Sequence, residues 1–137
     1  MFFGNKRSKL QNRIDSLIGA GTQIEGNVVF SGGLRVDGHI KGNVSADGDK
    51  SSTLVISEHA RIEGTIQVSH VVINGTVAGG PVHATEYVEL QAKSRVLGDV
   101  YYKKLEMHLG AVIEGKLVHR EGEETSPVVE LKTVSNN

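Results

Sequence analysis

A five-residue pattern (apolar, any residue, Gly, any residue, apolar) recurs along a chain of 137 residues. Six copies occupy residues 24–28, 36–40, 62–66, 73–77, 96–100 and 113–117. Repeats this short cannot bury an apolar face alone, so they are stable only when neighbouring repeats stack. The chain is therefore predicted to form a solenoid with one core running along the stack.

The repeating unit is about 17 residues long, and the units fall at 16–32, 33–53, 54–70, 71–86, 87–103 and 104–120. The last two units agree best. Five residues of unit 87–103 have counterparts 17 positions later, at Leu105, Met107, Ile113, Gly115 and Leu117. Apolar residues within a unit are two positions apart, or a multiple of two. This is the period of a strand that buries one face.

Composition also favours strands. Val and Ile together number 27 against 10 Leu, and Trp is absent. β-branched residues favour strands, whereas a helical domain is richer in Leu, Ala, Glu and Lys. Each unit has room for about three short strands, and successive units pair in parallel about 4.8 Å apart. The expected fold is all-β, a parallel β-helix of about six coils.

A second class of β-helix is the left-handed hexapeptide-repeat helix of acyltransferases. Two triplets recur at six-residue spacing, Ile18, Ile24 and Phe30, and then Ile56, Ile62 and Val68. The phase slips after Val68, and the clearest copies are 17 positions apart, whereas three hexapeptides need 18. An acyltransferase-like enzyme is therefore the alternative and not the leading interpretation.

Several phrases of the chain resemble the bactofilins, a family of small bacterial cytoskeletal proteins. They are residues 18–28 (Ile-Gly-Ala-Gly-Thr-Gln-Ile-Glu-Gly-Asn-Val), residues 36–44 (Val-Asp-Gly-His-Ile-Lys-Gly-Asn-Val), and Ala-x-Ile-Glu-Gly beginning at Ala60 and Ala111. The resemblance covers about residues 16–120. The polar stretch 47–53 is longer than the coil needs and is expected to be a surface loop.

The resemblance implies a right-handed, single-stranded, triangular β-helix at 16–120 between an N-terminal membrane-targeting tail, 1–15, and a disordered acidic tail, 121–137. It further implies a non-enzymatic scaffold that polymerises end to end into nonpolar filaments without nucleotide. Such filaments lie on the inner face of the cytoplasmic membrane and localise proteins that build or trim the cell wall. The expected location is therefore cytoplasmic and peripheral to that membrane.

The two ends of a solenoid expose apolar side chains and unpaired strand edges. No amphipathic segment follows the last coil, so that end is predicted to be uncapped. At the other end, Leu10, Ile14 and Leu17 have the spacing of a short capping helix. The predicted self-assembly interface consists of Ile18, Ile24, Val28, Leu105, Met107, Leu109, Ile113, Leu117 and Val118.

The N-terminal segment places apolar residues beside basic ones. Apolar side chains can enter a bilayer interface while basic groups contact anionic head groups. The predicted membrane-binding residues are Met1, Phe2, Phe3, Lys6, Arg7 and Lys9. The chain as a whole has a formal charge of -1, so it has no overall positive field that would attract nucleic acid.

Chemistry-bearing patterns are sparse. The six His are scattered without metal-ligand spacing, and Cys is absent. Asp47 and Asp49 resemble the start of a calcium loop that lacks its remaining ligands. No catalytic residue, metal site or cofactor is predicted. Besides the scaffold and the acyltransferase-like enzyme, a monomeric binding module with both ends capped remains open.

Overall fold

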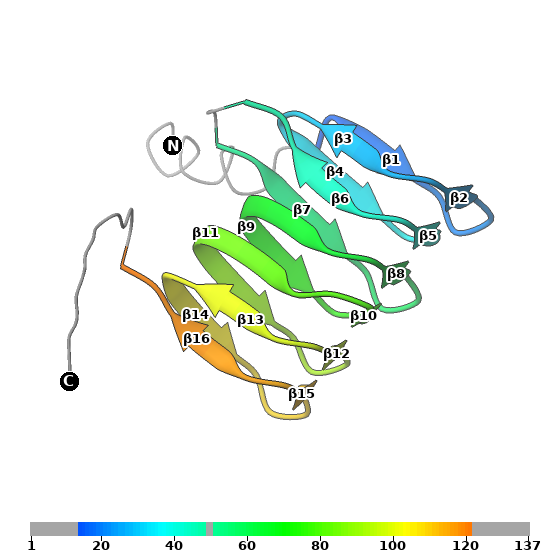
Figure 1. Ribbon diagram of the computed structural model, residues 1–137. Coiled ribbons are helices and arrows are strands. Elements are labelled where there is room, and N and C mark those ends of the chain that lie inside the picture. Colours follow the sequence, from blue (N-terminus) through cyan, green and yellow to red (C-terminus); the bar gives the residue numbers. More distant parts are fainter. Residues whose placement is uncertain (1–13, 49–50, 122–137) are drawn as a thin grey trace, which may run out of the picture.

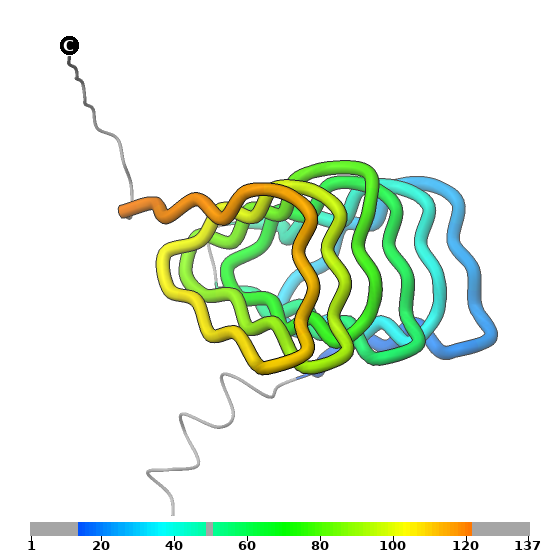
Figure 2. The backbone as a smooth tube through the Cα atoms, turned by 90° about the horizontal axis from the view of Figure 1, so that it is seen from below, coloured from blue at the N-terminus to red at the C-terminus, as the bar shows by residue number. Residues whose placement is uncertain are grey.

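The computed structural model describes residues 14–48 and 51–121 and contains sixteen β-strands and no helix within them. Every strand pair is parallel. The chain winds through about six coils that follow one another along a single axis, as Figures 1 and 2 show. The predicted all-β solenoid is confirmed.

Each coil contributes one strand segment to each of three faces. The first face contains β1 (Ser16–Ile18), β4 (Gly33–Val36), β7 (Thr53–Ile56), the second halves of β9 (Ile66–Ile73) and β11 (Val82–Leu90), and β14 (Lys104–Met107). The second face contains β2 (Gln23–Glu25), β5 (His39–Lys41), β8 (Arg61–Glu63), β10 (Thr76–Ala78), β12 (Arg95–Leu97) and β15 (Val112–Glu114). The third face contains β3 (Val28–Phe30), β6 (Val44–Ala46), the first halves of β9 and β11, β13 (Val100–Tyr102) and β16 (Leu117–His119).

The length of a coil varies along the rod, as the register partners on the second face show. Ile40 pairs with Ile62 across the longest coil, and Ile62 pairs with Val77 across the shortest. Towards the C-terminal end, Val96 pairs with Ile113 at an intermediate spacing. A coil of three hexapeptides needs 18 residues, so the coils of 15 residues (62 to 77) and 17 residues (96 to 113) argue against the acyltransferase-like alternative.

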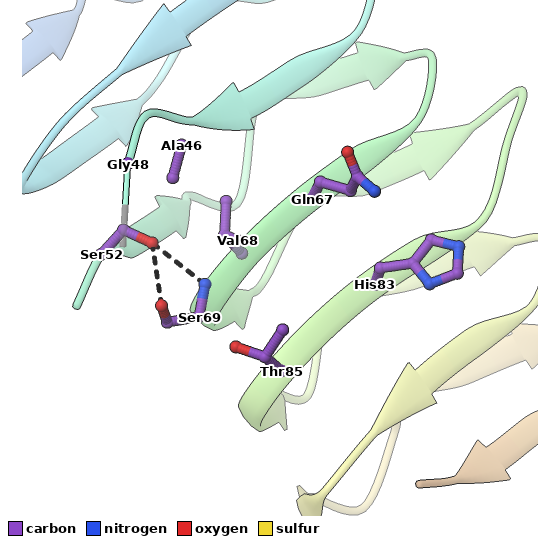
Figure 3. A pocket seen from close by; sticks show the side chains of 8 residues that line it. All are labelled: Ala46, Gly48, Ser52, Gln67, Val68, Ser69, His83 and Thr85. Atoms are coloured by element: carbon purple, nitrogen blue, oxygen red, sulfur yellow. Dashed lines mark hydrogen bonds between the residues drawn. The ribbon is translucent and has the colours of Figure 1, made fainter. Parts of the chain in front are cut away.

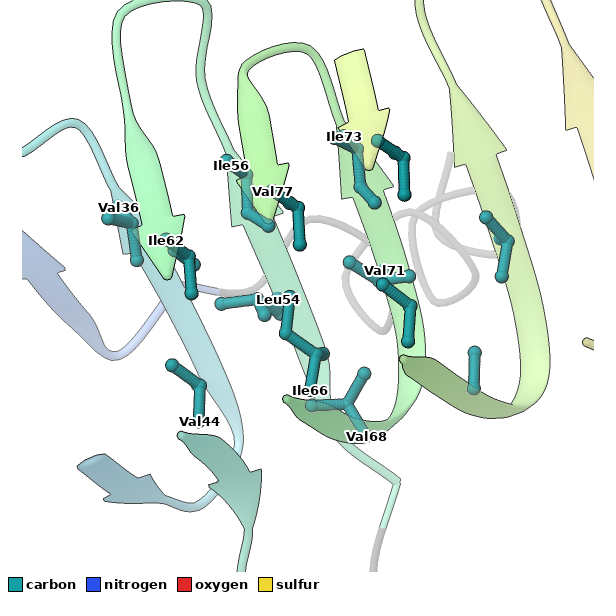
Figure 4. Packing of buried hydrophobic residues seen from close by; sticks show 14 of the residues in the cluster. Val36, Val44, Leu54, Ile56, Ile62, Ile66, Val68, Val71, Ile73 and Val77 are labelled. Atoms are coloured by element: carbon teal, nitrogen blue, oxygen red, sulfur yellow. The ribbon is translucent and has the colours of Figure 1, made fainter. Parts of the chain in front are cut away.

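The core is built from columns of small branched side chains, one residue from each coil (Figure 4). Each face contributes at least one fully buried column, such as Val36, Ile56, Ile73 and Leu90 on the first face, Ile40, Ile62, Val77 and Val96 on the second, and Val44, Ile66, Val82 and Val100 on the third. Every one of these side chains has an exposed fraction of 0%. Columns of Val and Ile fill the narrow interior, which explains the composition.

A column of glycines lies at the corner between the second and third faces and consists of Gly26, Gly42, Gly64, Gly98 and Gly115. The other two glycines of the sequence pattern, Gly38 and Gly75, lie at the corner between the first and second faces. A Cβ added to Gly64 would collide with the carbonyl oxygen of Gly42, and one added to Gly42 would collide with that of Gly26. The obstacle is therefore the backbone of the preceding coil and not the core. In the first coil, Gly26 has open space around its Cβ position.

This difference gives a stability prediction. Gly64→Ala must displace the neighbouring coil, and overpacking of this kind costs about 1–3 kcal/mol. Gly26→Ala meets no neighbour, and only its φ of +137° opposes a side chain. Thermal unfolding at one protein concentration, followed by far-UV circular dichroism, should show a clearly larger loss for Gly64→Ala. Equal losses would mean that backbone conformation alone requires the glycines.

The N-terminal capping helix and the surface loop were both expected from the sequence. The capping helix is wrong for Ile14 and Leu17, because Leu17 belongs to strand β1 and Ile14 lies in extended chain before it. Leu10 lies outside the described residues. In the predicted surface loop, Asp47 and Gly48 are exposed, whereas Ser52 is buried. Residues 49–50 lie outside the described part of the chain, and so does the Asp49 half of the calcium-like pattern.

Candidate functional site: the two ends of the solenoid

Both ends of the described solenoid present strands that are paired on one side only. At the N-terminal end, β1, β2 and β3 pair with β4, β5 and β6. At the C-terminal end, β14, β15 and β16 pair with β11, β12 and β13. Each end therefore offers three open strand edges, one per face, and an unpaired strand edge is a template for pairing with another chain.

Exposed apolar side chains are concentrated at the same two ends. Within residues 14–48 and 51–121, all the large hydrophobic residues that are exposed belong to the first or the last coil: Ile14, Leu17, Val29, Met107, Leu109, Val112 and Leu117. The four coils between them contribute none to this set. Apolar surface gathered in the two terminal coils indicates an interaction site, whereas single apolar residues scattered along the rod would not.

The predicted N-terminal interface residues are the ends of the core columns. Ile18 stacks below Val36, and Val28 stacks below Val44. Ile24 occupies the same place under Ile40. All three predicted residues are half-buried and pack on the core from one side.

Most of the predicted C-terminal interface residues also end core columns. Met107 follows Leu90, Ile113 follows Val96 and Leu117 follows Val100. Met107 is 46% exposed and Leu117 is 39% exposed, although their column neighbours are fully buried. Leu105, after Val88 on the first face, is half-buried.

Leu109 and Val118 lie apart from these columns. Leu109 is 96% exposed in the turn between β14 and β15. Val118 pairs with Tyr101 on the outward side of the third face, half-buried. The alternation of a strand accounts for this outward position, because Val118 directly follows the inward Leu117.

The predicted membrane-binding residues Met1, Phe2, Phe3, Lys6, Arg7 and Lys9 lie outside the described residues. In the part of the chain that the structure describes, there is no helix long and apolar enough to cross a bilayer.

Side-chain acceptors join successive coils at the corner beside the glycine column. Asn27 Oδ1 accepts the backbone N–H of Asn43, and Asn43 Oδ1 accepts that of Thr65. Asp99 Oδ1 does the same for Lys116 in the last coil. The ladder stops there, since an ammonium group cannot accept a hydrogen bond. The sequence analysis did not predict this ladder, although its acceptor residue always follows the repeated Gly.

The outer faces carry several short polar networks. Ser57 Oγ donates to Asp37 Oδ1 at 2.5 Å, and this bond, helped by Arg35, holds the pKa of Asp37 below its usual value despite partial desolvation. On the third face, the His83 and Tyr101 rings stack with centroids 4.5 Å apart, and the Arg120 guanidinium lies 4.7 Å from the Tyr101 centroid. Burial and then the Arg120 charge lower the pKa of His83.

A shallow hollow lies on the third face, near the corner that leads to the first (Figure 3). Its best-defined contacts join two serines: Ser52 Oγ donates to Ser69 Oγ at 3.3 Å and accepts the Ser69 N–H at 3.0 Å. Gln67, His83 and Thr85 line the rest of the hollow. These serines tie neighbouring coils together, and the described residues that line the hollow include no carboxylate.

A second cluster was not anticipated from the sequence. Glu89, Glu106 and His108 meet on the first face, where Glu89 and Glu106 are register partners on β11 and β14. Hydrogen bonds from Tyr87 and then His108 lower the pKa of Glu106. Burial, together with the nearby carboxylates, raises the pKa of Tyr87 above its usual value.

Comparison with known proteins finds a family model and relatives that match most of the chain. Residues 16–118 match the family model described as "Bactofilin: Polymer-forming cytoskeletal". Two curated relatives come from Myxococcus xanthus (strain DK1622). Bactofilin BacP is 26% identical over 110 residues, which cover 80% of this chain and 44% of BacP. Bactofilin BacO is 28% identical over 103 residues, which cover 75% of this chain and 78% of BacO.

The chain thus spans less than half of BacP and most of BacO. No solved structure is significantly similar to it. The family match covers nearly the whole solenoid, including both open ends. The chain belongs to the bactofilins, a family of polymer-forming cytoskeletal proteins.

Proposed function

We propose that this bactofilin polymerises end to end through its first and last coils, without nucleotide, into nonpolar filaments on the inner face of the cytoplasmic membrane. The observation that carries the proposal is the confinement of exposed large apolar side chains, among the described residues, to those two coils. Stacking a second rod on either end would pair the open strand edges and cover the exposed side chains that end core columns, such as Met107 and Leu117. The polymer-forming character of the family supports the same conclusion.

The outer faces have a different role in this proposal. The parallel strands of each face, continued from rod to rod, would present the same side chains at regular intervals along a filament. Such a surface can position other proteins, and we propose that its clients are proteins that synthesise or hydrolyse the cell wall. The N-terminal segment would attach the filament to anionic lipid.

Electron microscopy of negatively stained protein tests the core of the proposal. Purified full-length chain, in near-physiological salt and without added nucleotide, should form filaments, because nothing in the proposed contact requires a phosphate group. Monodisperse monomer by light scattering at tens of micromolar would contradict end-to-end assembly and favour the capped binding module. Compact trimers would instead favour the acyltransferase-like enzyme.

A further inference from the structure

Three metal-ligating side chains converge on the outer side of the first face, near the C-terminal end. His108 Nε2 lies 3.1 Å from Glu106 Oε2 and 3.3 Å from Glu89 Oε2. One ligand atom from each of the three residues falls within 4.8 Å of the others. The set mixes an imidazole with two carboxylates, a combination that zinc accepts in proteins.

The separations suit a metal ion. With bonds of about 2.0–2.1 Å, two ligands of a tetrahedral zinc lie about 3.3 Å apart. Both imidazole-to-carboxylate distances are close to that value. A small rotation of the exposed Glu106 side chain would bring the third pair to the same spacing, and the fourth position would open to water.

Neighbouring side chains already orient the two carboxylates. Tyr87 Oη donates to Glu106 Oε1 at 2.7 Å, which leaves Oε2 facing His108. Gln91 Nε2 donates to Glu89 Oε2 at 3.0 Å. Hydrogen bonds of this kind fix ligand geometry around metals, and their loss typically weakens metal binding about 10–100-fold.

The cluster also places two negatively charged side chains next to each other. Glu89 and Glu106 are direct register partners, and like charges in that position destabilise a sheet. A divalent cation between them would neutralise this repulsion and tie the terminal strand β14 to β11. The imidazole donor favours zinc over magnesium, which prefers oxygen ligands, and the Irving–Williams order places zinc above manganese.

We propose that Glu89, Glu106 and His108 form a zinc-binding site that joins the last two coils. The site faces outward from the solenoid, so it is accessible in a single chain and on the side of a polymer. It does not depend on the proposed assembly, and a failure of one proposal leaves the other standing.

Equilibrium dialysis of metal-free, full-length chain against Zn²⁺ tests the site directly. We expect one zinc per chain, and more than about 100-fold weaker binding for His108→Gln or Glu106→Gln, because the loss of one of three protein ligands must cost more than the loss of an orienting hydrogen bond. Tyr87→Phe should weaken binding about tenfold, since it removes only an orienting hydrogen bond. Zinc should also raise the unfolding temperature of wild type but not of His108→Gln.

The matched control is His119→Gln. His119 Nε2 lies 3.7 Å from Glu121 Oε2 on the same terminal coil but faces only one carboxylate. Zinc affinity should be unchanged in this variant. The proposal is overturned if wild type binds no zinc, if it binds no more tightly than His108→Gln, or if His119→Gln loses as much affinity. Far-UV circular dichroism of each variant checks that the solenoid is intact.

Discussion

Leu117→Arg is expected to abolish filament formation while leaving a folded, soluble, β-rich protein. Leu117 ends a core column at the C-terminal edge and is only 39% exposed, so its side chain packs on Val100 from one side and would meet a second rod on the other. A guanidinium in that contact would be buried without a partner, which costs several kcal/mol. Sedimentation should find no polymer in the pellet, and Met107→Arg should behave alike.

The control for added charge is Gln67→Arg. Gln67 is exposed on the outward side of β9. Its coil lies in the middle of the rod and not at either end. This variant should pellet like wild type. If Leu117→Arg and Met107→Arg also pellet normally, the C-terminal coil does not form the contact.

The same variants measure filament polarity. A nonpolar filament alternates two self-complementary contacts, one between C-terminal ends and one between N-terminal ends. Blocking the C-terminal contact would then leave dimers joined at their N-terminal ends. A polar filament uses one contact between unlike ends, and blocking it would leave monomers. Light scattering of Leu117→Arg should therefore report a dimer, and Ile24→Arg should give the complementary dimer.

Periodicity made the solenoid predictable. A buried strand allows apolar residues only at every second position, and a stacked coil must repeat them at the length of the coil. Val96 and Ile113 satisfy both conditions, and the structure pairs them. The ends followed from the same reasoning, since the first and last members of each column have a neighbour on one side only.

Corners and termini were harder to predict, because period two does not continue through them. Leu17 fits a helical spacing with Ile14, yet its backbone pairs with Arg35 as a strand and its side chain points outward. Leu109 continues the two-residue spacing of Leu105 and Met107, but it occupies an exposed turn. In both cases the sequence shows the apolar character of the residue and does not show the direction of its side chain.

The cluster of Glu89, Glu106 and His108 shows a different limit. A search for metal ligands at short spacing along the chain cannot find it, because Glu89 and Glu106 are a whole coil apart and meet only across neighbouring strands. In a solenoid, residues that are one coil length apart in the sequence lie side by side on neighbouring strands. Searching for ligand residues separated by about one coil would have brought these two glutamates together.

The second large effect is expected at the membrane. Residues 1–9 should attach the filament to anionic vesicles, with Phe2 and Phe3 entering the interface and Lys6, Arg7 and Lys9 contacting head groups. Two Phe side chains contribute roughly 1.5–3 kcal/mol each. Each basic residue adds about 1 kcal/mol near an anionic surface. A single copy should therefore bind weakly and reversibly.

Assembly should convert this weak contact into firm attachment. Once one segment of a filament is bound, its neighbours act at high effective concentration, and avidity can exceed single-site affinity by about 10²–10⁴-fold. In liposome flotation, wild type should rise with anionic vesicles, with partial loss in high salt. The double variant Phe2→Ser with Phe3→Ser should remain at the bottom. Phe2→Leu with Phe3→Leu, which keeps the apolar character, should float.

Leu117→Arg separates attachment from avidity, because its N-terminal segment is intact while its assembly is blocked. We expect this variant to float poorly although every predicted membrane-binding residue is present. Flotation equal to wild type would show that one or two segments suffice, and avidity would then be unnecessary. Undiminished flotation after deletion of residues 1–9 would place the membrane contact on the solenoid itself, and the outward residues of its three faces would become the next positions to mutate.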